Sequence, residues 1–184
     1  ATTEIYTLSL HDALPTLLRR DSLGCALYGD DLEWCRILRQ TLAALDATRA
    51  CRVWGTAERL SAPHAALLNG TLIQSFELDD VHRQGVLHVG AVTLPPLIAI
   101  TELRPGLSGR DFLTAAVAGY EIGPRVGKCM GPQHIGQGWH SGATVGVFSA
   151  ASGAARKDHR RHPDHDGVAA ALRPHLRRLP GRRA

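Results

Sequence analysis

Residues 65–88 read AALLNGTLIQSFELDDVHRQGVLH, an apolar segment that runs into a group of carboxylates and imidazoles. Residues 65–78 are apolar on most sides, which predicts a helix buried among other helices. Glu77, Asp79, Asp80 and His88 then follow in the most apolar part of the chain, where unpaired charges are costly to bury. This pattern predicts an acid/base site at the end of a buried helix.

Upstream of this segment, the sequence predicts a helix and a small β element. Apolar residues at helical spacing predict a helix over residues 31–45, with Asp31 as its N-cap. Residues 52–55 form a short β-like run closed by glycine, which predicts a small strand or hairpin. Ser61, followed by Pro63, predicts the start of the helix that contains residues 65–78.

Downstream, the pattern remains helical. A helix is predicted over residues 90–102, which Pro95 and Pro96 are expected to kink or divide. Ser108 followed by Asp111 is typical of a capping box at a helix start. The remaining predicted segments are a loop over 80–88, a helix over 109–129 bent at Pro124, a Gly-rich loop over 130–139 and a small-residue helix over 140–156. The fold class predicted is therefore all-α and bundle-like.

Composition limits the class of protein. The 184 residues are enough for one domain with a sizeable core, and the low aromatic content favours packed helices over a β-sandwich. A nucleic-acid site would need basic residues on a folded face, interleaved with aromatics. Here the excess of basic residues lies in the tail of the chain, residues 158–184, which has no aromatic residue. Nucleic acid is therefore not an expected partner. The formal charge of +4 comes from arginines after residue 157, namely Arg160, Arg161, Arg173, Arg177, Arg178, Arg182 and Arg183.

The cysteines and the apolar runs give no sign of secretion or membrane insertion. Cys25, Cys35, Cys51 and Cys129 lack paired spacing, so we expect reduced, mostly buried thiols and no metal site. The longest apolar run, residues 89–100, is too short to span a bilayer. The sequence therefore predicts a cytoplasmic protein that does not insert into a membrane.

Several short motifs, in order, resemble the MmgE/PrpD family, which includes 2-methylcitrate dehydratase and cis-aconitate decarboxylase. The resemblance runs from about residue 20 to residue 157. It implies a large helical domain followed by a smaller α/β lid domain, cofactor-free chemistry on a small polycarboxylate and a homodimer. The motifs are Ala65-Ala66-Leu67-Leu68-Asn69-Gly70, Leu78-Asp79-Asp80, Leu87-His88, Ala118-Gly119-Tyr120-Glu121 and Gly138-Trp139-His140.

The resemblance also implies site residues. Glu77 stands at the family's acidic position before the Asp-Asp pair, and His88 and His140 match its two histidines. Val81 replaces a residue that is often threonine in the family. The family's lysines lie in stretches that this chain lacks, and neither Lys128 nor Lys157 matches them.

Both ends of the chain depart from the family. Residues 1–15 look like the translation of a sequencing adapter, so we expect a non-native leader. Residues 158–184 lose all periodicity, as an out-of-frame reading of a GC-rich gene would. We therefore expect residues 16–157 to be a truncated helical domain without its lid, with residues 20–157 packed and both ends packing poorly.

Each candidate residue also has a plainer interpretation. Asp79 and Asp80 could be an exposed loop pair, or one could anchor the loop through backbone N–H groups while the other faces the pocket. His82 and His134 could be surface loop residues. Two further expectations concern packing: a buried Glu121–Arg125 salt bridge, and packing anchors at Trp54 and Trp139.

The residue types suit elimination from a hydroxy tricarboxylate, which needs a base, an acid and cations for the carboxylates. Histidine serves in the first two roles because its pKa lies near neutrality. We predict catalytic roles for His88, His140, Glu77 and Asp80, and substrate binding by Asp79 and His134. The four catalytic residues are expected to converge on one cavity. Two alternatives are an inactive helical fragment that only dimerises and a metal-dependent hydrolase that uses the histidines.

Overall fold

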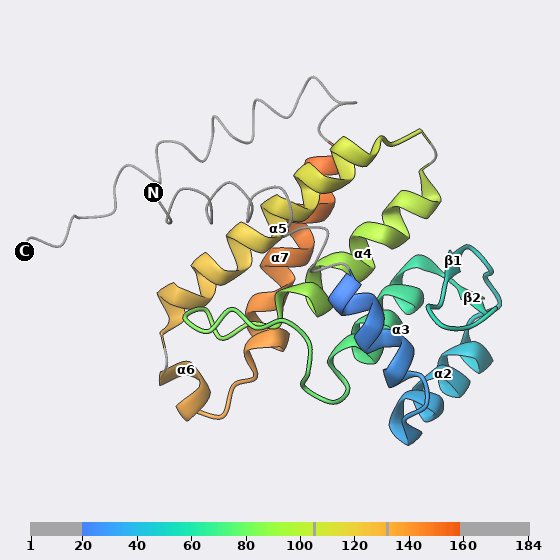
Figure 1. The fold of residues 1–184 in the computed structure, drawn as a ribbon, viewed down its shortest axis with the longest axis horizontal. Helices are drawn as coiled ribbons and strands as arrows, with labels where there is room; N and C mark the ends of the chain where they lie inside the picture. The colour runs from blue at the N-terminus through green and yellow to red at the C-terminus, as the bar shows by residue number, and fades with distance from the viewer. Residues whose placement is uncertain (1–19, 105, 132, 159–184) are drawn as a thin grey trace, which may run out of the picture.

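A computed structural model describes residues 20–158, apart from residues 105 and 132 (Figure 1). The predicted leader (1–15) and nearly all of the predicted tail (158–184) lie outside these residues. The all-α prediction is confirmed, because helices dominate and the β structure of the described part is one pair of two-residue strands and one isolated bridge. After a helical stretch at 20–29, the elements are α2 (Glu33–Leu45), β1 (Cys51–Arg52), β2 (Arg59–Leu60), α3 (Ala62–Gln74), α4 (Val89–Leu103), α5 (Gly109–Met130), α6 (Gln133–Gly136) and α7 (Ser141–Asp158).

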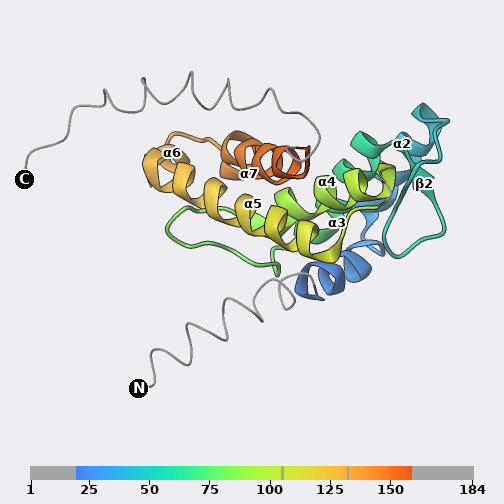
Figure 2. The same cartoon turned by 90° about the horizontal axis from the view of Figure 1, so that it is seen from above.

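Helix α4 lies at the centre of the arrangement and contacts α3, α5 and α7. Figures 1 and 2 show α5 and α7 side by side on one side of α4, with α3, α2 and the hairpin on the other. The hairpin is antiparallel, with Cys51 opposite Leu60. The predicted β element is therefore confirmed, but its first strand begins at Cys51, one residue before the predicted start. None of the helices in residues 20–158 is both long and apolar enough to cross a bilayer.

Helix α3 is buried as its apolar sequence predicts. Leu68, Leu72 and Ile73 are fully buried in the core that α3 forms with α2 and the hairpin. Leu67, on the outer side, remains half exposed. The helix ends at Gln74 rather than near residue 78, because the backbone turns before the acidic residues begin.

The two prolines do not divide α4, so of the two expected effects, a kink or a division, the division is absent. Pro95 and Pro96 both lie inside one continuous helix. A proline removes a backbone donor and normally disfavours a helix interior. Here Leu94, Pro95 and Leu97 are buried beneath neighbouring helices, and this apolar burial offsets the lost hydrogen bonds.

Two predicted helix starts have different outcomes. Asp31 is not the N-cap of α2, because it belongs to the turn that closes the preceding helix, where its N–H donates to the Tyr28 carbonyl. Leu32 takes the N-cap position. Ser61 is the N-cap of α3, but its side chain makes no capping bond. Asp46 instead accepts the Ser61 N–H at 2.7 Å.

The capping box of α5 is confirmed. Ser108 Oγ accepts the Asp111 N–H at 3.2 Å, and the Asp111 carboxylate accepts the Ser108 N–H at 3.3 Å. Beyond α5, the predicted loop over 130–139 contains the short helix α6, which the sequence analysis missed. Among the cysteines, Cys129 is exposed and the other three are buried, all as free thiols.

Candidate functional site

The segment between α3 and α4 carries most of the predicted site. It leaves α3 through a turn in which Glu77 has a left-handed φ of 59°, which is uncommon for a residue with a side chain. His82 donates its N–H to the Leu87 carbonyl at 2.9 Å and closes the loop. His88 then becomes the N-cap residue of α4. The two ends of this segment meet, because His88 contacts Glu77 and Asp79.

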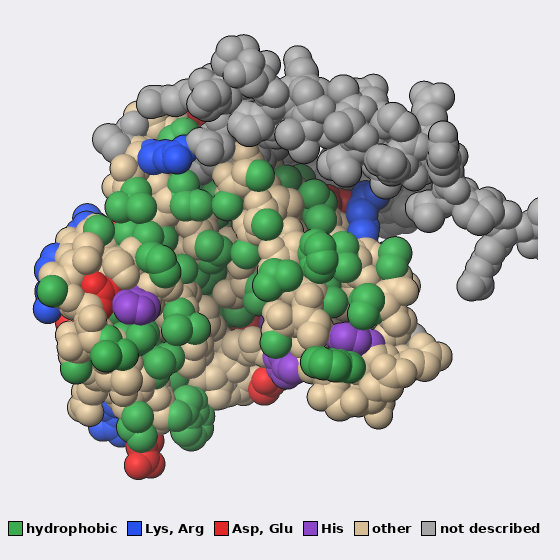
Figure 3. Space-filling view, turned by 180° about the vertical axis from the view of Figure 1, so that it is seen from behind, with side chains coloured by type: hydrophobic (Ala, Val, Ile, Leu, Met, Phe, Trp, Pro, Cys, Tyr) green, Lys and Arg blue, Asp and Glu red, His purple; other side chains and the backbone are tan. Residues whose placement is uncertain are grey.

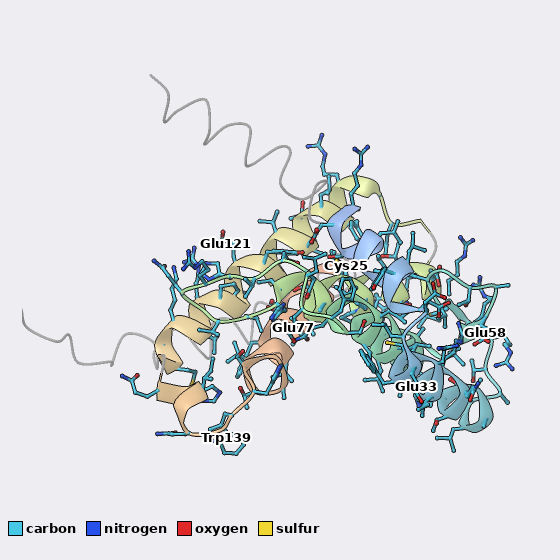
Figure 4. All side chains as sticks on the ribbon, turned by 60° about the horizontal axis from the view of Figure 1, so that its bottom comes forward. Cys25, Glu33, Glu58, Glu77, Glu121 and Trp139 are labelled. Atoms are coloured by element: carbon cyan, nitrogen blue, oxygen red, sulfur yellow. The ribbon has the colours of Figure 1, made fainter. Side chains whose placement is uncertain are left out.

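The imidazole of His88 lies between two carboxylates. Its Nδ1 is 3.0 Å from Asp79 Oδ1, and its Nε2 is 3.2 Å from Glu77 Oε2. The Asp79 side chain is fully buried, whereas the Glu77 side chain is 68% exposed. Figure 4 shows Glu77 near the middle of the molecule, on the segment that follows α3. His88 thus has one ring nitrogen toward the interior and one toward solvent.

Asp79 is placed to orient the His88 ring. Burial raises the pKa of the Asp79 carboxyl, while the neighbouring His88 lowers it. Oδ2 of Asp79 is buried and has no hydrogen-bond partner among the described residues. An ionised Asp79 would hold a proton on Nδ1 and leave Nε2 as the reactive nitrogen.

Asp80 faces a different partner from Asp79. Its carboxylate accepts the N–H of Gly90, in the first turn of α4, at 3.1 Å. Burial, followed by the charge of Asp79, raises the pKa of Asp80 to about 6. The exposed-loop interpretation of this pair is wrong, because Asp79 is buried and Asp80 is largely buried.

A cavity of about 540 Å³ lies between the loop and α5. Arg125 and Lys128 bring positive charge to it. The expected Glu121–Arg125 ion pair is present at 2.6 Å, but both side chains are more than half exposed, so its predicted burial is wrong. The lining residues are Asp80, Val81, His82, Val89, Tyr120, Glu121, Pro124, Arg125 and Lys128.

His140 lies before α7 and is exposed. No hydrogen bond or ion pair joins it to Glu77, Asp80 or His88 within the part of the chain that the structure describes. The structure therefore brings Glu77, Asp79 and His88 into contact and places Asp80 next to them. Of the four predicted catalytic residues, only Asp80 lines the 540 Å³ cavity. The convergence of Glu77, His88 and His140 with Asp80 on one cavity stays a prediction.

His134 and Trp139 form a separate pair. His134 is buried, so its interpretation as an exposed loop residue is wrong, and its Nε2 lies 2.7 Å from Thr144 Oγ1. Trp139 stacks on His134 with ring centroids 6.3 Å apart, but it is 57% exposed and does not anchor the core. Figure 4 shows Trp139 at the lower edge of the molecule, away from Glu77. Trp54, by contrast, packs against two of the core clusters as expected.

Ser22 and Tyr120 also belong to this region, although neither was among the predicted site residues. Both hydroxyls lie near Gly90 beside Asp80. Tyr120 belongs to a motif quoted for the family resemblance, so a signal existed, whereas nothing in the sequence distinguishes Ser22. Across the described ranges, no three His, Cys, Asp or Glu side chains are arranged to hold a metal ion. Figure 3 shows histidine side chains with acidic neighbours at two separate places on one face, at the left and below the centre, each beside hydrophobic side chains.

Comparison with known proteins matches residues 11–159 to the MmgE/PrpD N-terminal domain. The chain belongs to the MmgE/PrpD family. A cis-aconitate decarboxylase-like protein, oryM, of Aspergillus oryzae is 37% identical over 74% of this chain and 30% of its own length. The cis-aconitate decarboxylases of Aspergillus terreus and Homo sapiens are 36% and 30% identical, over 71% and 74% of this chain. The alignments cover 28% of the Aspergillus terreus protein and 29% of the human one. The chain therefore spans less than a third of the length of each of these three relatives.

Proposed function

We propose that this chain supplies part of the active site of a cofactor-free lyase that acts on a small polycarboxylate. The observation that carries the proposal is His88, whose imidazole lies between Asp79 and Glu77 at the start of a buried helix. A buried carboxylate on one ring nitrogen fixes the tautomer, and the opposite nitrogen, which lies beside the exposed Glu77 carboxylate, is the one that would exchange a proton with a ligand.

The proposed chemistry is proton transfer at carbon. In decarboxylation, the C–C bond to one carboxylate breaks, carbon dioxide leaves and a proton from an acid such as His88 or His140 takes its place. In dehydration, a base removes a C–H proton and an acid protonates the leaving hydroxyl. Glu77 and Asp79 would orient His88, with Asp80 supporting them and His134 near a substrate carboxylate.

Between these two reactions we place decarboxylation of cis-aconitate first. Each of the relatives described above is named for that activity, and all of them align with the segment that contains His88. Dehydration of a 2-methylcitrate-like acid comes second, on the family resemblance alone. Both reactions need the same kinds of proton donor and acceptor, so the residues of the site do not separate them.

The proposal concerns the full-length protein. Cations that bind the substrate carboxylates stabilise charge in such reactions, and the lysines to which the resemblance assigns this role have no counterpart in this chain. We therefore propose that the 184-residue chain is inactive by itself, and that the complete enzyme is a cytoplasmic homodimer.

A matched pair of substitutions in the full-length protein tests the role of His88. His88→Gln should lower kcat for cis-aconitate decarboxylation by at least about a hundredfold, because a general acid or base contributes that much or more. The control is His64→Gln, since His64 Nδ1 also faces an aspartate, Asp46, at 2.8 Å, but it lies in the first turn of α3, at the opposite end of that helix from Glu77. Itaconate and carbon dioxide would be measured by NMR, with 2-methylcitrate assayed in parallel.

The two substitutions have distinct outcomes. Loss of activity in His88→Gln with retention in His64→Gln supports the proposal. Equal activity in both variants would overturn the role of His88. If the wild-type enzyme transforms neither acid, the lyase proposal itself fails.

A further inference from the structure

The start of α4 is surrounded by polar side chains from three segments. Ser22 comes from the helical stretch 20–29, Asp80 from the loop and Tyr120 from α5. A Cβ on Gly90 would lie 2.3 Å from Asp80 Oδ1, 2.5 Å from Ser22 Oγ and 2.9 Å from the Tyr120 hydroxyl. These oxygens therefore converge on one point, and only glycine leaves room for them.

Asp80 supplies the cap that α4 lacks locally. His88 occupies the N-cap position, but its side chain makes no capping bond, since both of its ring nitrogens face carboxylates. The first N–H groups of a helix have no partner within it, and negative charge is favourable there. The Asp80 carboxylate accepts one of them, the N–H of Gly90. Asp80 thus fixes where α4 begins, and His88 is the residue immediately before that start.

The two hydroxyls of this cluster are buried and have no hydrogen-bond partner among the described residues. A buried hydroxyl that donates to nothing is costly, and the Asp80 carboxylate keeps free lone pairs after binding Gly90. Burial raises the pKa of Tyr120, so its phenol keeps the proton and remains a donor. The cluster therefore has donors and an acceptor at the same place.

We propose that Tyr120, together with Ser22, is a positioning residue for His88. Its phenol makes no direct hydrogen bond to Asp80, and it supports the carboxylate through one water molecule. The carboxylate then sets the start of α4 and, with it, the place of the imidazole. The inference rests on the proposed catalytic role of His88, but the effect on α4 and on the ring can be measured without any turnover.

The test uses Tyr120→Phe in the 184-residue chain, studied by NMR. Exchange of the Gly90 amide with solvent should become about fivefold faster. The reason is that the Asp80 carboxylate, which accepts the Gly90 N–H, loses the hydrogen bond that holds it in place. The ring ¹⁵N signals of His88 should shift. Exchange of the Leu72 amide in α3 should not change. Tyr28→Phe is the matched control, since Tyr28 is 61% exposed and its ring packs on Phe76, so neither Gly90 nor His88 should respond.

Two results would overturn the inference. One is unchanged Gly90 exchange and unchanged His88 ring signals in Tyr120→Phe. The other is equally faster exchange at Leu72 and Gly90, which would mean a general loss of packing. If Tyr120→Phe does not fold, Ser22→Ala is measured in the same way, with the same expected changes at Gly90 and His88 and the same overturning results.

A kinetic readout in the full-length enzyme separates this inference from the proposed function. There Tyr120→Phe should lower kcat several-fold and leave KM nearly unchanged, because a displaced His88 slows proton transfer more than it weakens binding. A change in KM alone would overturn the positioning role. If the wild-type enzyme has no activity, the proposed function fails, while the exchange measurements still decide whether Tyr120 positions His88.

Discussion

Asp79 and Asp80 are neighbours in sequence, but their carboxylates serve different partners. Asp79 turns inward to the His88 ring, and Asp80 turns to the first turn of α4. The sequence anticipated that one of the pair would anchor the loop through backbone N–H groups. Which one does so depends on the path of the backbone after Glu77, which the sequence does not specify.

The raised pKa of Asp80 predicts a pH-dependent stability that Asp80→Asn should remove. Between about pH 4 and pH 6 the folded protein binds the Asp80 proton more tightly than the unfolded chain, so the wild type loses stability as pH rises. The free energy of unfolding of the variant, relative to wild type, should rise by up to about 3 kcal/mol from pH 4 to pH 7.5.

Urea unfolding at a series of pH values measures this difference. The groups that influence the Asp80 carboxyl are Asp79, Asp21, His88 and Tyr120, and all of them remain in the variant. Asp31→Asn, at an exposed position, controls for the removal of one charge. A difference between Asp80→Asn and wild type that does not change with pH would contradict the prediction.

At the scale of elements, small residues set how closely α5 and α7 pack. A Cβ on Gly123 of α5 would lie 1.8 Å from Ser149 Oγ on α7, and the Ser149 hydroxyl in turn donates to the Gly119 carbonyl at 2.9 Å. The small-residue helix predicted over residues 140–156 allows such close packing, but the pattern does not tell which glycines make the contact.

Gly123→Ala should therefore lower the free energy of unfolding by about 1–3 kcal/mol, through overpacking at the α5–α7 contact. Gly24→Ala is the matched control, since a Cβ there would meet no described atom within 4 Å. Because Gly24 lies in a helix, alanine should stabilise it by about 0.5–1 kcal/mol. Chemical denaturation of both variants gives the comparison, and equal stabilities would refute the role of Gly123.

At the scale of the whole molecule, this chain spans less than a third of the length of the relatives named above, and the resemblance implies that the substrate-binding lysines lie outside its residues. We expect the purified 184-residue chain to decarboxylate no cis-aconitate at a useful rate. Loss of even one group that stabilises developing charge costs on the order of a thousandfold in rate. Itaconate formation, followed by NMR at equal concentrations of this chain and the full-length enzyme, measures the difference. Comparable rates would show that the site is complete without those lysines.

The sequence by itself determined the fold class and most helices, because apolar periodicity and capping residues act over a few neighbours. It located α3, the α5 capping box and the loop that contains His88. It left open whether Pro95 and Pro96 kink or divide α4, since a proline disfavours a helix only locally, while burial between neighbouring helices, which keeps α4 continuous, acts over the whole domain.

Only the tertiary structure decided which polar groups meet. It placed Asp79 and Glu77 on the two nitrogens of His88, and it brought Ser22 and Tyr120 to Gly90 from segments about 70 and 30 residues away. Such contacts depend on how whole helices pack, and no local pattern encodes a partner at that distance. The same packing buried Asp79 and Asp80 and so raised the pKa of each carboxyl.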